Sequence, residues 1–311
     1  MALLSIRNLE VYFPLPDGTV HVLDSIDLDL EDEEKLALIG ETGSGKTVLG
    51  RAIVRLLPPG AHIHGEILYN KRNLLDLAPA EMRQIRGREI AIILQNPASS
   101  MNPVLTVGNQ IKEAVQVRWG LTGRPAYRQV INLLERVGLP LRAAVGYPHQ
   151  LSGGMRQRAL VALGLALHPR LLIADEPTKG LDSPLRAQIV RLLKDVLEDG
   201  MSLFLITHDL PAARELAETV AVMYAGQIVE YGRADRIFAQ PRHPYTLGLL
   251  ASHPSRGLKA IPGIAPSLTN LPVGCRFHPR CADAREICRY KAPPFLEITK
   301  GHKVRCHHCS R

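Results

Sequence analysis

A glycine-rich segment followed by a lysine and a threonine lies near residue 45 and has the composition of a phosphate-binding loop. It fits the pattern GxxxxGK[ST] and consists of Gly40, Glu41, Thr42, Gly43, Ser44, Gly45, Lys46 and Thr47. Its glycines let the backbone curl so that several N–H groups point at one phosphate, and the N-terminus of a following helix adds partial positive charge. Lys46 would reach the β- and γ-phosphates, and the Thr47 hydroxyl would coordinate Mg²⁺. The segment predicts a site for a triphosphate and its magnesium ion.

A pair of carboxylates ends an apolar segment later in the chain. Residues 171–174 read Leu-Leu-Ile-Ala, and Asp175 and Glu176 follow at once. Acidic pairs also end strands on solvated surfaces, but downstream of a phosphate loop the segment resembles a Walker B strand. Asp175 would hold Mg²⁺ directly or through water, and Glu176 would orient the attacking water. The pair favours hydrolysis of the bound triphosphate.

The segment that points to a family is Leu-Ser-Gly-Gly-Met-Arg-Gln-Arg at 151–158, which resembles the LSGGQ signature of ABC ATPases. Ser152, Gly153 and Gly154 are small residues at an expected helix N-terminus. They could present N–H groups and a hydroxyl to a γ-phosphate bound on another subunit. The resemblance implies that two cassettes enclose the nucleotide, which is ATP in this family.

Other positions match the landmarks of that family in the same order. Gln95 resembles the Q-loop glutamine that contacts Mg²⁺, Asp182 the D-loop aspartate at the dimer interface, and His208 the switch histidine that positions the catalytic glutamate. Phe13 resembles the aromatic residue that stacks on adenine. Tyr12 is the competing choice, because strand alternation lets only one of the two face the site.

These residues need particular elements to position them. Alternating apolar residues before and after a turn at 14–18 predict antiparallel strands at the front of the chain. A short apolar run at 35–39 predicts a buried strand that leads through the glycine loop into a helix, so a strand-loop-helix is expected over 35–57. A strand at 171–174, helical spacing over 185–197 and a strand at 203–207 form a β-α-β pattern, which predicts a parallel sheet.

Helical spacing broken by glycine and proline over 104–150 predicts a helical insert. Together with the resemblance, these patterns predict an α/β fold with a P-loop (RecA-like) ABC ATPase core, an antiparallel β subdomain, a helical signature subdomain and a small cysteine-rich C-terminal extension. The expected domains are an ATPase domain over 1–240, with its helical subdomain at about 96–158, and the extension over 241–311.

The extension carries its own resemblance. The segments His-Pro-Tyr-Thr at 243–246, Ile-Pro-Gly at 261–263 and Leu-Pro-Val-Gly-Cys-Arg-Phe-His-Pro-Arg-Cys at 271–281 look like the C-terminal extension of dipeptide and oligopeptide importer ATPases. This resemblance implies peptide uptake, although nickel, metallophore, glutathione or haem uptake by related systems is an alternative. Lys179 departs from the family, which usually has a small uncharged residue there.

All five cysteines and nearly all of the net positive charge lie in the same tail. From Arg236 to Arg311 there are 13 Lys and Arg and 3 Asp and Glu, within a chain of net charge +8. A cytosolic protein would use such cysteines for metal binding rather than for disulfides. Their spacing does not choose between zinc and an iron–sulfur cluster. The resemblance implies a [4Fe-4S] cluster on Cys275, Cys281, Cys288 and Cys306, with no role assigned to Cys309.

The remaining expectations concern location and partners. No segment approaches the roughly 18 consecutive apolar residues of a membrane span, and the first residues lack a secretory signal. The resemblance implies a peripheral protein on the cytoplasmic face of the inner membrane. Its expected partners are a second ABC ATPase subunit, two transmembrane permease subunits and an extracytoplasmic substrate-binding protein. Members of the family often work as two different ATPases, so the resemblance favours a heterodimer.

A distant alternative is a non-transport ABC ATPase whose basic tail binds nucleic acid. The segment between Lys46 and Ser152 has room only for a small helical subdomain, whereas DNA-repair relatives insert long coiled coils there. Translational relatives carry two cassettes, and this chain has one. No nucleic-acid partner is therefore expected.

Overall fold

The structure, a computed structural model, describes residues 2–16, 18–254 and 257–309. The chain forms two compact units, the first made of residues 1–77 and 204–311 and the second of residues 78–203. Each unit is described by itself. In the described part of the chain, no helix is both long enough and apolar enough to cross a membrane.

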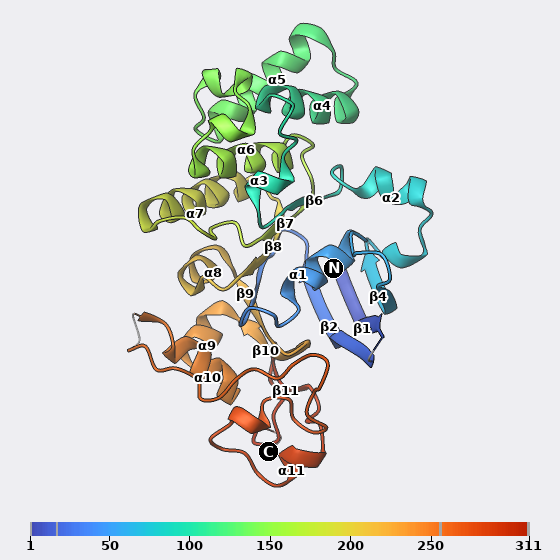
Figure 1. Cartoon of the computed structure of the whole chain (residues 1–311), viewed down its shortest axis with the longest axis vertical. Helices are drawn as coiled ribbons and strands as arrows, with labels where there is room; N and C mark the ends of the chain where they lie inside the picture. The colour runs from blue at the N-terminus through green and yellow to red at the C-terminus, as the bar shows by residue number, and fades with distance from the viewer. Residues whose placement is uncertain (1, 17, 255–256, 310–311) are drawn as a thin grey trace. The chain divides into compact units, whose positions relative to one another are not determined.

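The first unit contains both ends of the chain, which are blue and orange to red in Figure 1. Its elements in chain order are β1 (Ala2–Leu15), β2 (Gly18–Glu31), β3 (Lys35–Ile39), α1 (Lys46–Ile53), β4 (His62–Tyr69), β5 (Arg72–Asn73), η1 (Leu74–Asp76), most of β8 (Ser202–Thr207), α8 (Leu210–Leu216), β9 (Thr219–Tyr224), β10 (Gln227–Arg233), α9 (Ala234–Ala239), α10 (Pro244–Ala251), η5 (His278–Arg280), α11 (Ile287–Tyr290), β11 (Leu296–Thr299) and β12 (His302–Val304).

An antiparallel sheet forms the front of this unit, in the order β2-β1-β4-β5. Strands β1 and β2 are long, and the apolar side chains of Leu4, Ile6, Leu9 and Val11 in β1 are buried. The period of two residues expected for a sheet with one covered face holds on each side of a register shift between Ile6 and Leu9. The predicted antiparallel subdomain is confirmed.

The strands of the second sheet that lie in this unit follow the order β11-β12-β10-β9-β3-β8. Strand β3 pairs in parallel with β9, and its residues Leu36–Ile39 are wholly buried. Such continuous burial matches the apolar run that predicted a strand covered on both faces. Helix α1 follows as expected but ends at Ile53, before Arg55 takes a left-handed conformation (φ 52°).

The C-terminal extension contributes to this sheet, which its irregular sequence did not predict. Strand β12 pairs antiparallel with β10, with Glu230 opposite Val304, and β11 pairs with β12. Because β12 pairs with β10 at Glu230 and Tyr231, the tail is hydrogen-bonded into the same unit as the phosphate loop. The boundary predicted at residue 240 does not coincide with a division between the compact units.

The second unit, which runs from cyan through green to yellow in Figure 1, is mainly helical. Its elements are α2 (Pro79–Ile85), β6 (Ile90–Ile93), α3 (Pro97–Ser100), α4 (Val107–Trp119), α5 (Gly123–Arg136), η2 (Leu141–Val145), η3 (Pro148–Gln150), α6 (Gly153–Leu165), β7 (Leu171–Asp175) and α7 (Ser183–Leu197).

Helices α4, α5 and α6 pack on one another and form the predicted helical insert. Their shared core contains Ile111, Val130 and Leu134, each fully buried. Strands β6 and β7 pair in parallel, with Ile93 opposite Ala174. The mixed α/β fold with parallel strand pairs, an antiparallel subdomain and a helical insert is confirmed.

Candidate functional site

The phosphate loop connects β3 to α1, and close backbone approaches fix its shape. A Cβ atom on Gly40 would lie 2.2 Å from the carbonyl oxygen of Met223, so only glycine fits at this position. Gly45 is left-handed (φ 106°) and caps α1, and no side chain bonds the helix N-terminus there. The loop is also tied to the β9–β10 turn, because the Gly226 N–H donates to the Ser44 carbonyl at 2.9 Å.

Lys46 lies over this loop with its charge directed at the backbone. Its Nζ donates to the carbonyl oxygens of Gly40 at 2.9 Å and Glu41 at 2.8 Å, and the side chain is nearly buried. The buried ammonium and a helix N-terminus with no acidic residue in its first turn both place positive charge at this loop. The triphosphate site at these residues stays a prediction.

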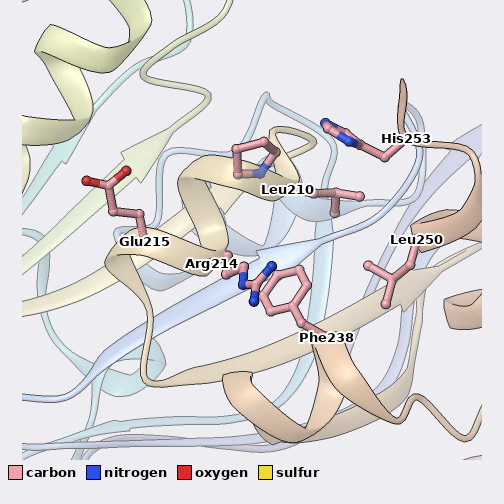
Figure 2. A pocket seen from close by; sticks show the side chains of 7 residues that line it. Leu210, Arg214, Glu215, Phe238, Leu250 and His253 are labelled. Atoms are coloured by element: carbon pink, nitrogen blue, oxygen red, sulfur yellow. The ribbon is translucent and has the colours of Figure 1, made fainter. Parts of the chain in front are cut away.

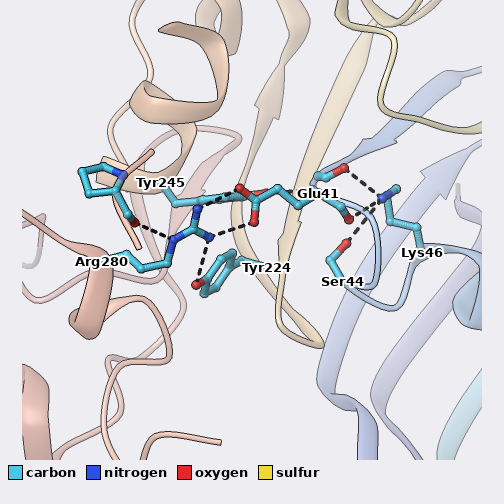
Figure 3. A network of polar contacts seen from close by, with 8 residues as sticks. Glu41, Ser44, Lys46, Tyr224, Tyr245 and Arg280 are labelled. Atoms are coloured by element: carbon cyan, nitrogen blue, oxygen red, sulfur yellow. Dashed lines mark hydrogen bonds and ion pairs between the residues drawn. The ribbon is translucent and has the colours of Figure 1, made fainter. Parts of the chain in front are cut away.

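Glu41, in the same loop, contacts two residues of the extension, Arg280 and Tyr245, for which the sequence predicted no role at this site. The Arg280 guanidinium donates two hydrogen bonds to the Glu41 carboxylate, from Nη1 at 2.8 Å and from Nη2 at 3.1 Å. Figure 3 shows the two side chains facing each other. The Glu41 N–H donates to the Tyr245 hydroxyl at 2.8 Å. The hydrogen bond to Glu41 raises the pKa of Arg280, whereas burial raises the pKa of Tyr245.

Tyr245 and Arg280 lie in the segments at 243–246 and 271–281 that carry the family resemblance of the extension. The position of Arg280, directly before Cys281 in a basic segment, is the one sequence feature that draws attention to this arginine. That feature does not indicate that Arg280 pairs with Glu41, more than 200 positions earlier. Only the fold brings the two together.

In the second unit, the predicted magnesium and water residues follow adjacent strands. Asp175 ends β7 and is almost fully buried, and Glu176 comes next in a left-handed conformation (φ 51°). Gln95 lies just beyond β6, which is parallel to β7. Because the carboxyl ends of parallel strands meet at one edge of a sheet, the structure brings these three residues to the same edge.

The signature residues lie at the N-terminus of α6. Ser152 is the N-cap residue and its Oγ accepts from the Met155 N–H at 3.3 Å. Gly153 is exposed, and a Cβ there would meet nothing within 4 Å. Gly154 is buried, and a Cβ there would lie 2.5 Å from the Leu185 side chain. The two glycines therefore have different tasks: the first faces open space and the second allows α6 to approach α7.

Asp182 has a local role in addition to the predicted one. It is the N-cap residue of α7, and its Oδ1 accepts from the Leu185 N–H at 2.9 Å. Its side chain is exposed. Lys179 is also exposed, which agrees with a solvated surface lysine.

The first unit carries the remaining predicted residues. His208 is exposed directly after β8, the neighbour of β3 in the sheet. Tyr12 stacks on His62, with ring centroids 5.0 Å apart, and its hydroxyl lies 3.2 Å from His64 Nε2. Phe13 is half-buried and has no aromatic contact among the described residues. Phe13 as the adenine residue stays a prediction.

The cysteines of the extension share one neighbourhood. Burial raises the pKa of Cys275 to about 11, and the nearby thiols of Cys288, Cys306 and Cys281 add to the effect. No disulfide joins the five cysteines, all of which are described. Within the described ranges, however, no three His, Cys, Asp or Glu side chains are arranged to hold a metal ion. The donor chemistry suits a cluster, but a closed ligand set is not formed.

A separate cavity of about 320 Å³ lies among α8, α9 and α10 of the first unit and contains none of the predicted site residues. It is lined by Leu210, Pro211, Arg214, Glu215, Phe238, Leu250 and His253, and Figure 2 shows their side chains.

The strand, glycine loop and helix, with a buried lysine over the loop, define a nucleoside triphosphate-binding fold of the P-loop type. Residues 23–179 match the family described as ABC transporter, and residues 229–288 match the oligopeptide/dipeptide transporter C-terminal region. The chain belongs to the ABC transporter ATPase family.

Similar proteins share nearly the whole length. The oligopeptide transport ATP-binding protein OppD of Bacillus subtilis is 43% identical, over 97% of this chain and 88% of its own. A peptide import ATP-binding protein of Brucella abortus is also 43% identical, over 98% of this chain and 94% of its own.

Solved structures agree on the fold. The ATP-binding cassette MJ0796, solved as a dimer bound to ADP and Pi, has a TM-score of 0.68 at 27% identity and covers 74% of this chain and 98% of its own. The cbiO1 subunit from Clostridium perfringens has a TM-score of 0.66 at 27% identity and covers 77% of this chain and 91% of its own. ATP is the expected nucleotide of such a cassette.

Proposed function

We propose that this chain is the ATP-hydrolysing subunit of an importer for dipeptides or oligopeptides. The observation that carries the proposal is the 43% identity over almost the whole chain, extension included, to proteins named for peptide import and oligopeptide transport. The phosphate loop with Lys46 supports the ATPase part of the proposal, and the extension supports the peptide part. Nickel, metallophore, glutathione or haem cargo is the alternative that a transport assay would reveal.

In the proposed reaction, the loop amides of residues 40–47 and Lys46 hold the triphosphate, while Phe13 stacks on adenine. Thr47, Gln95 and Asp175 hold the magnesium ion, the last directly or through water. This assignment is supported by the buried Lys46 ammonium and by the common sheet edge that Gln95 and Asp175 share.

Hydrolysis then depends on the residues around the γ-phosphate. Glu176 orients the attacking water, and His208 hydrogen-bonds the γ-phosphate and positions Glu176. The Ser152-Gly153-Gly154 turn of a neighbouring cassette caps the same phosphate, and Asp182 lies at that dimer interface. The exposed N-terminus of α6 and the open space above Gly153 support a contact with another molecule at this turn.

The proposal includes partners that a single chain does not contain. They are a second ABC ATPase subunit, which we propose to differ from this one, two transmembrane permease subunits and an extracytoplasmic substrate-binding protein. Closure of the two cassettes on ATP would move the permease subunits, so the chain would act at the cytoplasmic face of the inner membrane. We propose no nucleic-acid partner.

Glu176→Gln tests the ATPase part. The variant keeps the side chain's size but cannot polarise water as a carboxylate does, so we expect it to bind MgATP and to hydrolyse it at least 100-fold more slowly. Glu198→Gln, at an exposed position at the end of α7, is the matched control. Wild-type turnover in Glu176→Gln would remove Glu176 from its proposed role.

The cargo is tested with the whole transporter. We expect permease subunits to co-purify with the tagged chain, and peptide-loaded binding protein to stimulate ATP turnover of the reconstituted complex. Stimulation by nickel, haem or glutathione instead of peptide would overturn the peptide proposal and leave the ATPase proposal intact.

We also propose that Cys275, Cys281, Cys288 and Cys306 hold a [4Fe-4S] cluster of structural role, with zinc as the alternative. The proximity of these four thiols supports a shared ligand set, and the excess of basic residues in the same segment would stabilise an anionic cluster. Anaerobic purification followed by iron, sulfide and zinc analysis tests it. We expect about four irons per chain, lost in Cys288→Ser; one zinc and no sulfide would exclude the cluster.

A further inference from the structure

One loop residue, Glu41, links the C-terminal extension to Lys46. Its carboxylate accepts two hydrogen bonds from Arg280, and its N–H donates to the buried Tyr245 hydroxyl of α10. Its carbonyl oxygen accepts from Lys46 Nζ at 2.8 Å. Every polar group of Glu41 is therefore tied either to the extension or to the lysine, as the dashed lines in Figure 3 trace.

The Arg280 guanidinium is itself fixed on several sides. Its Nε donates to the Pro262 carbonyl at 2.9 Å, and its Nη1 lies 3.4 Å from the Tyr224 hydroxyl oxygen. The guanidinium carbon lies 5.7 Å from the centre of the Tyr224 ring. Its side chain is only 6% exposed. A planar fork held in this way fixes both the position and the orientation of the carboxylate that it binds.

A second arginine of the same segment supports the loop from another side. Arg276 binds Asp24 and the Ala225 carbonyl. Ala225 and Gly226 form the β9–β10 turn, and the Gly226 N–H donates to Ser44 in the phosphate loop. The segment between Cys275 and Cys281 thus contacts the loop directly through one arginine and its supporting turn through the other.

We propose that Arg280 and Tyr245 are positioning residues for ATP binding, acting through Glu41. Arg280 neutralises a carboxylate that lies in the loop that receives a highly negative triphosphate, and together with Tyr245 it holds the backbone whose carbonyl orients Lys46. The proposal rests on the proposed ATP site in the loop at 40–47. It makes the extension part of the nucleotide-binding machinery.

The charges of Arg280 and Glu41 make the proposed role testable, because it predicts how ATP affinity changes when each charge is removed. Replacement of Arg280 by methionine would leave the Glu41 carboxylate unneutralised beside the phosphates, and like charges repel strongly at a partly buried site. Replacement of Glu41 by glutamine in the same chain would remove that repulsion. A purely structural role of Arg280 would not produce recovery of ATP affinity on the second substitution.

The test compares MgATP binding and ATPase kinetics of full-length wild type, Arg280→Met, Glu41→Gln and the double variant. We expect Arg280→Met to raise the MgATP Kd and KM about tenfold, equivalent to about 1.4 kcal/mol, with a smaller change in kcat. The double variant should recover most of the affinity. Tyr245→Phe, which removes one hydroxyl, should weaken binding with little change in folding.

Arg289→Met is the matched control. Like Arg280, Arg289 is an arginine next to a cysteine of the extension, but its side chain is exposed. Thermal unfolding without nucleotide monitors folding of every variant. If wild type binds MgATP and Arg280→Met and Tyr245→Phe bind it equally well, the proposal is wrong while the ATPase function stands. Failure of the wild type to bind MgATP would instead refute the proposed function.

Discussion

Two adjacent glycines of the signature segment show how neighbouring residues of one type can serve different purposes. Gly153 is exposed with open space around it, and Gly154 is buried against Leu185. A methyl group on Gly153 meets no atom of its own chain, whereas one on Gly154 overlaps the Leu185 side chain. The motif therefore combines an open surface position with a packing requirement.

This difference predicts separable effects of alanine substitution. Gly154→Ala should lower the free energy of unfolding by about 1–3 kcal/mol, because the methyl group forces α6 away from Leu185. Gly153→Ala should leave stability within about 0.5 kcal/mol and should reduce ATP turnover in the assembled transporter. Chemical denaturation of each purified variant, together with its ATPase rate, measures both. Equal destabilisation by the two substitutions would contradict the assigned roles.

At the scale of elements, the beginning of α7 depends on Asp182. The Asp182 carboxylate accepts from the Leu185 N–H, and so satisfies one of the amides that a helix N-terminus leaves without an intrahelical partner. The sequence resemblance assigns the same residue to a dimer interface. Capping and interface contact are compatible, because a cap uses one oxygen and the side chain is exposed.

Two substitutions separate these roles. Asp182→Ala should cost about 1 kcal/mol of stability through the lost cap, whereas Asp182→Asn should keep it, since asparagine caps as well as aspartate. If the charge acts at the cassette interface, both variants should reduce ATP turnover of the complex. Thermal unfolding and turnover measured on the same preparations distinguish the roles, and loss of stability in both variants would contradict a simple cap.

A buried carboxylate, that of Glu230, connects β10 to the extension. Glu230 of β10 is fully buried, accepts from the Arg242 and His243 N–H groups at 2.7 and 3.0 Å, and lies 2.8 Å from His302 Nε2. Burial alone would raise the pKa of Glu230, but these hydrogen bonds, first that from His302, lower it. The carboxylate thus joins β10, the start of α10 and β12.

Glu230→Ala should therefore loosen the extension. We expect a loss of about 3–5 kcal/mol, because three donors from two segments, Arg242 and His243 before α10 and His302 of β12, lose their acceptor. Limited proteolysis should show earlier cleavage within 241–311 than in wild type. Replacement of the exposed Glu297 of β11 by alanine is a control in the same extension, and equal behaviour of the two variants would argue against a central role of Glu230.

On the scale of the whole molecule, the extension and the phosphate loop belong to one compact unit. Strand β12 completes hydrogen bonding along β10, Arg280 holds Glu41, and an aromatic cluster of Tyr224, Tyr245 and Phe277 fills the space between, with ring centroids 4.5–5.5 Å apart. These contacts join the extension to the strands and the loop of the same compact unit, and the predicted domain boundary at residue 240 stays a prediction.

Truncation after Gln240 tests this directly. We expect the shortened chain to lose several kcal/mol of stability, equivalent to a fall in Tm of roughly 10 °C or more, and to bind MgATP less tightly. The exposed edge of β10 should also promote aggregation. A truncated chain with wild-type Tm and MgATP affinity would support an independent ATPase domain over 1–240, as the sequence suggested.

Residue types and their spacing along the chain were enough to predict an ATPase. Glycine, lysine and carboxylate patterns act through local geometry, since a loop between a buried strand and a helix is specified by residues that are close in the chain. The antiparallel front sheet and the helical insert followed from periodicities of 2 and 3.6 residues for the same reason. Short segments such as β11 and β12, three or four residues long, carry too little periodicity to be recognised.

The fold, in contrast, was needed to learn which distant residues lie next to one another. The pairing of Arg280 with Glu41 and the anchoring of three segments on Glu230 join positions tens to hundreds of residues apart, and no local pattern encodes such a pairing. The tight fit of Gly154 on Leu185 likewise depends on how two helices pack. Packing and hydrogen bonding between distant segments, rather than residue type, made the extension a support of the phosphate loop.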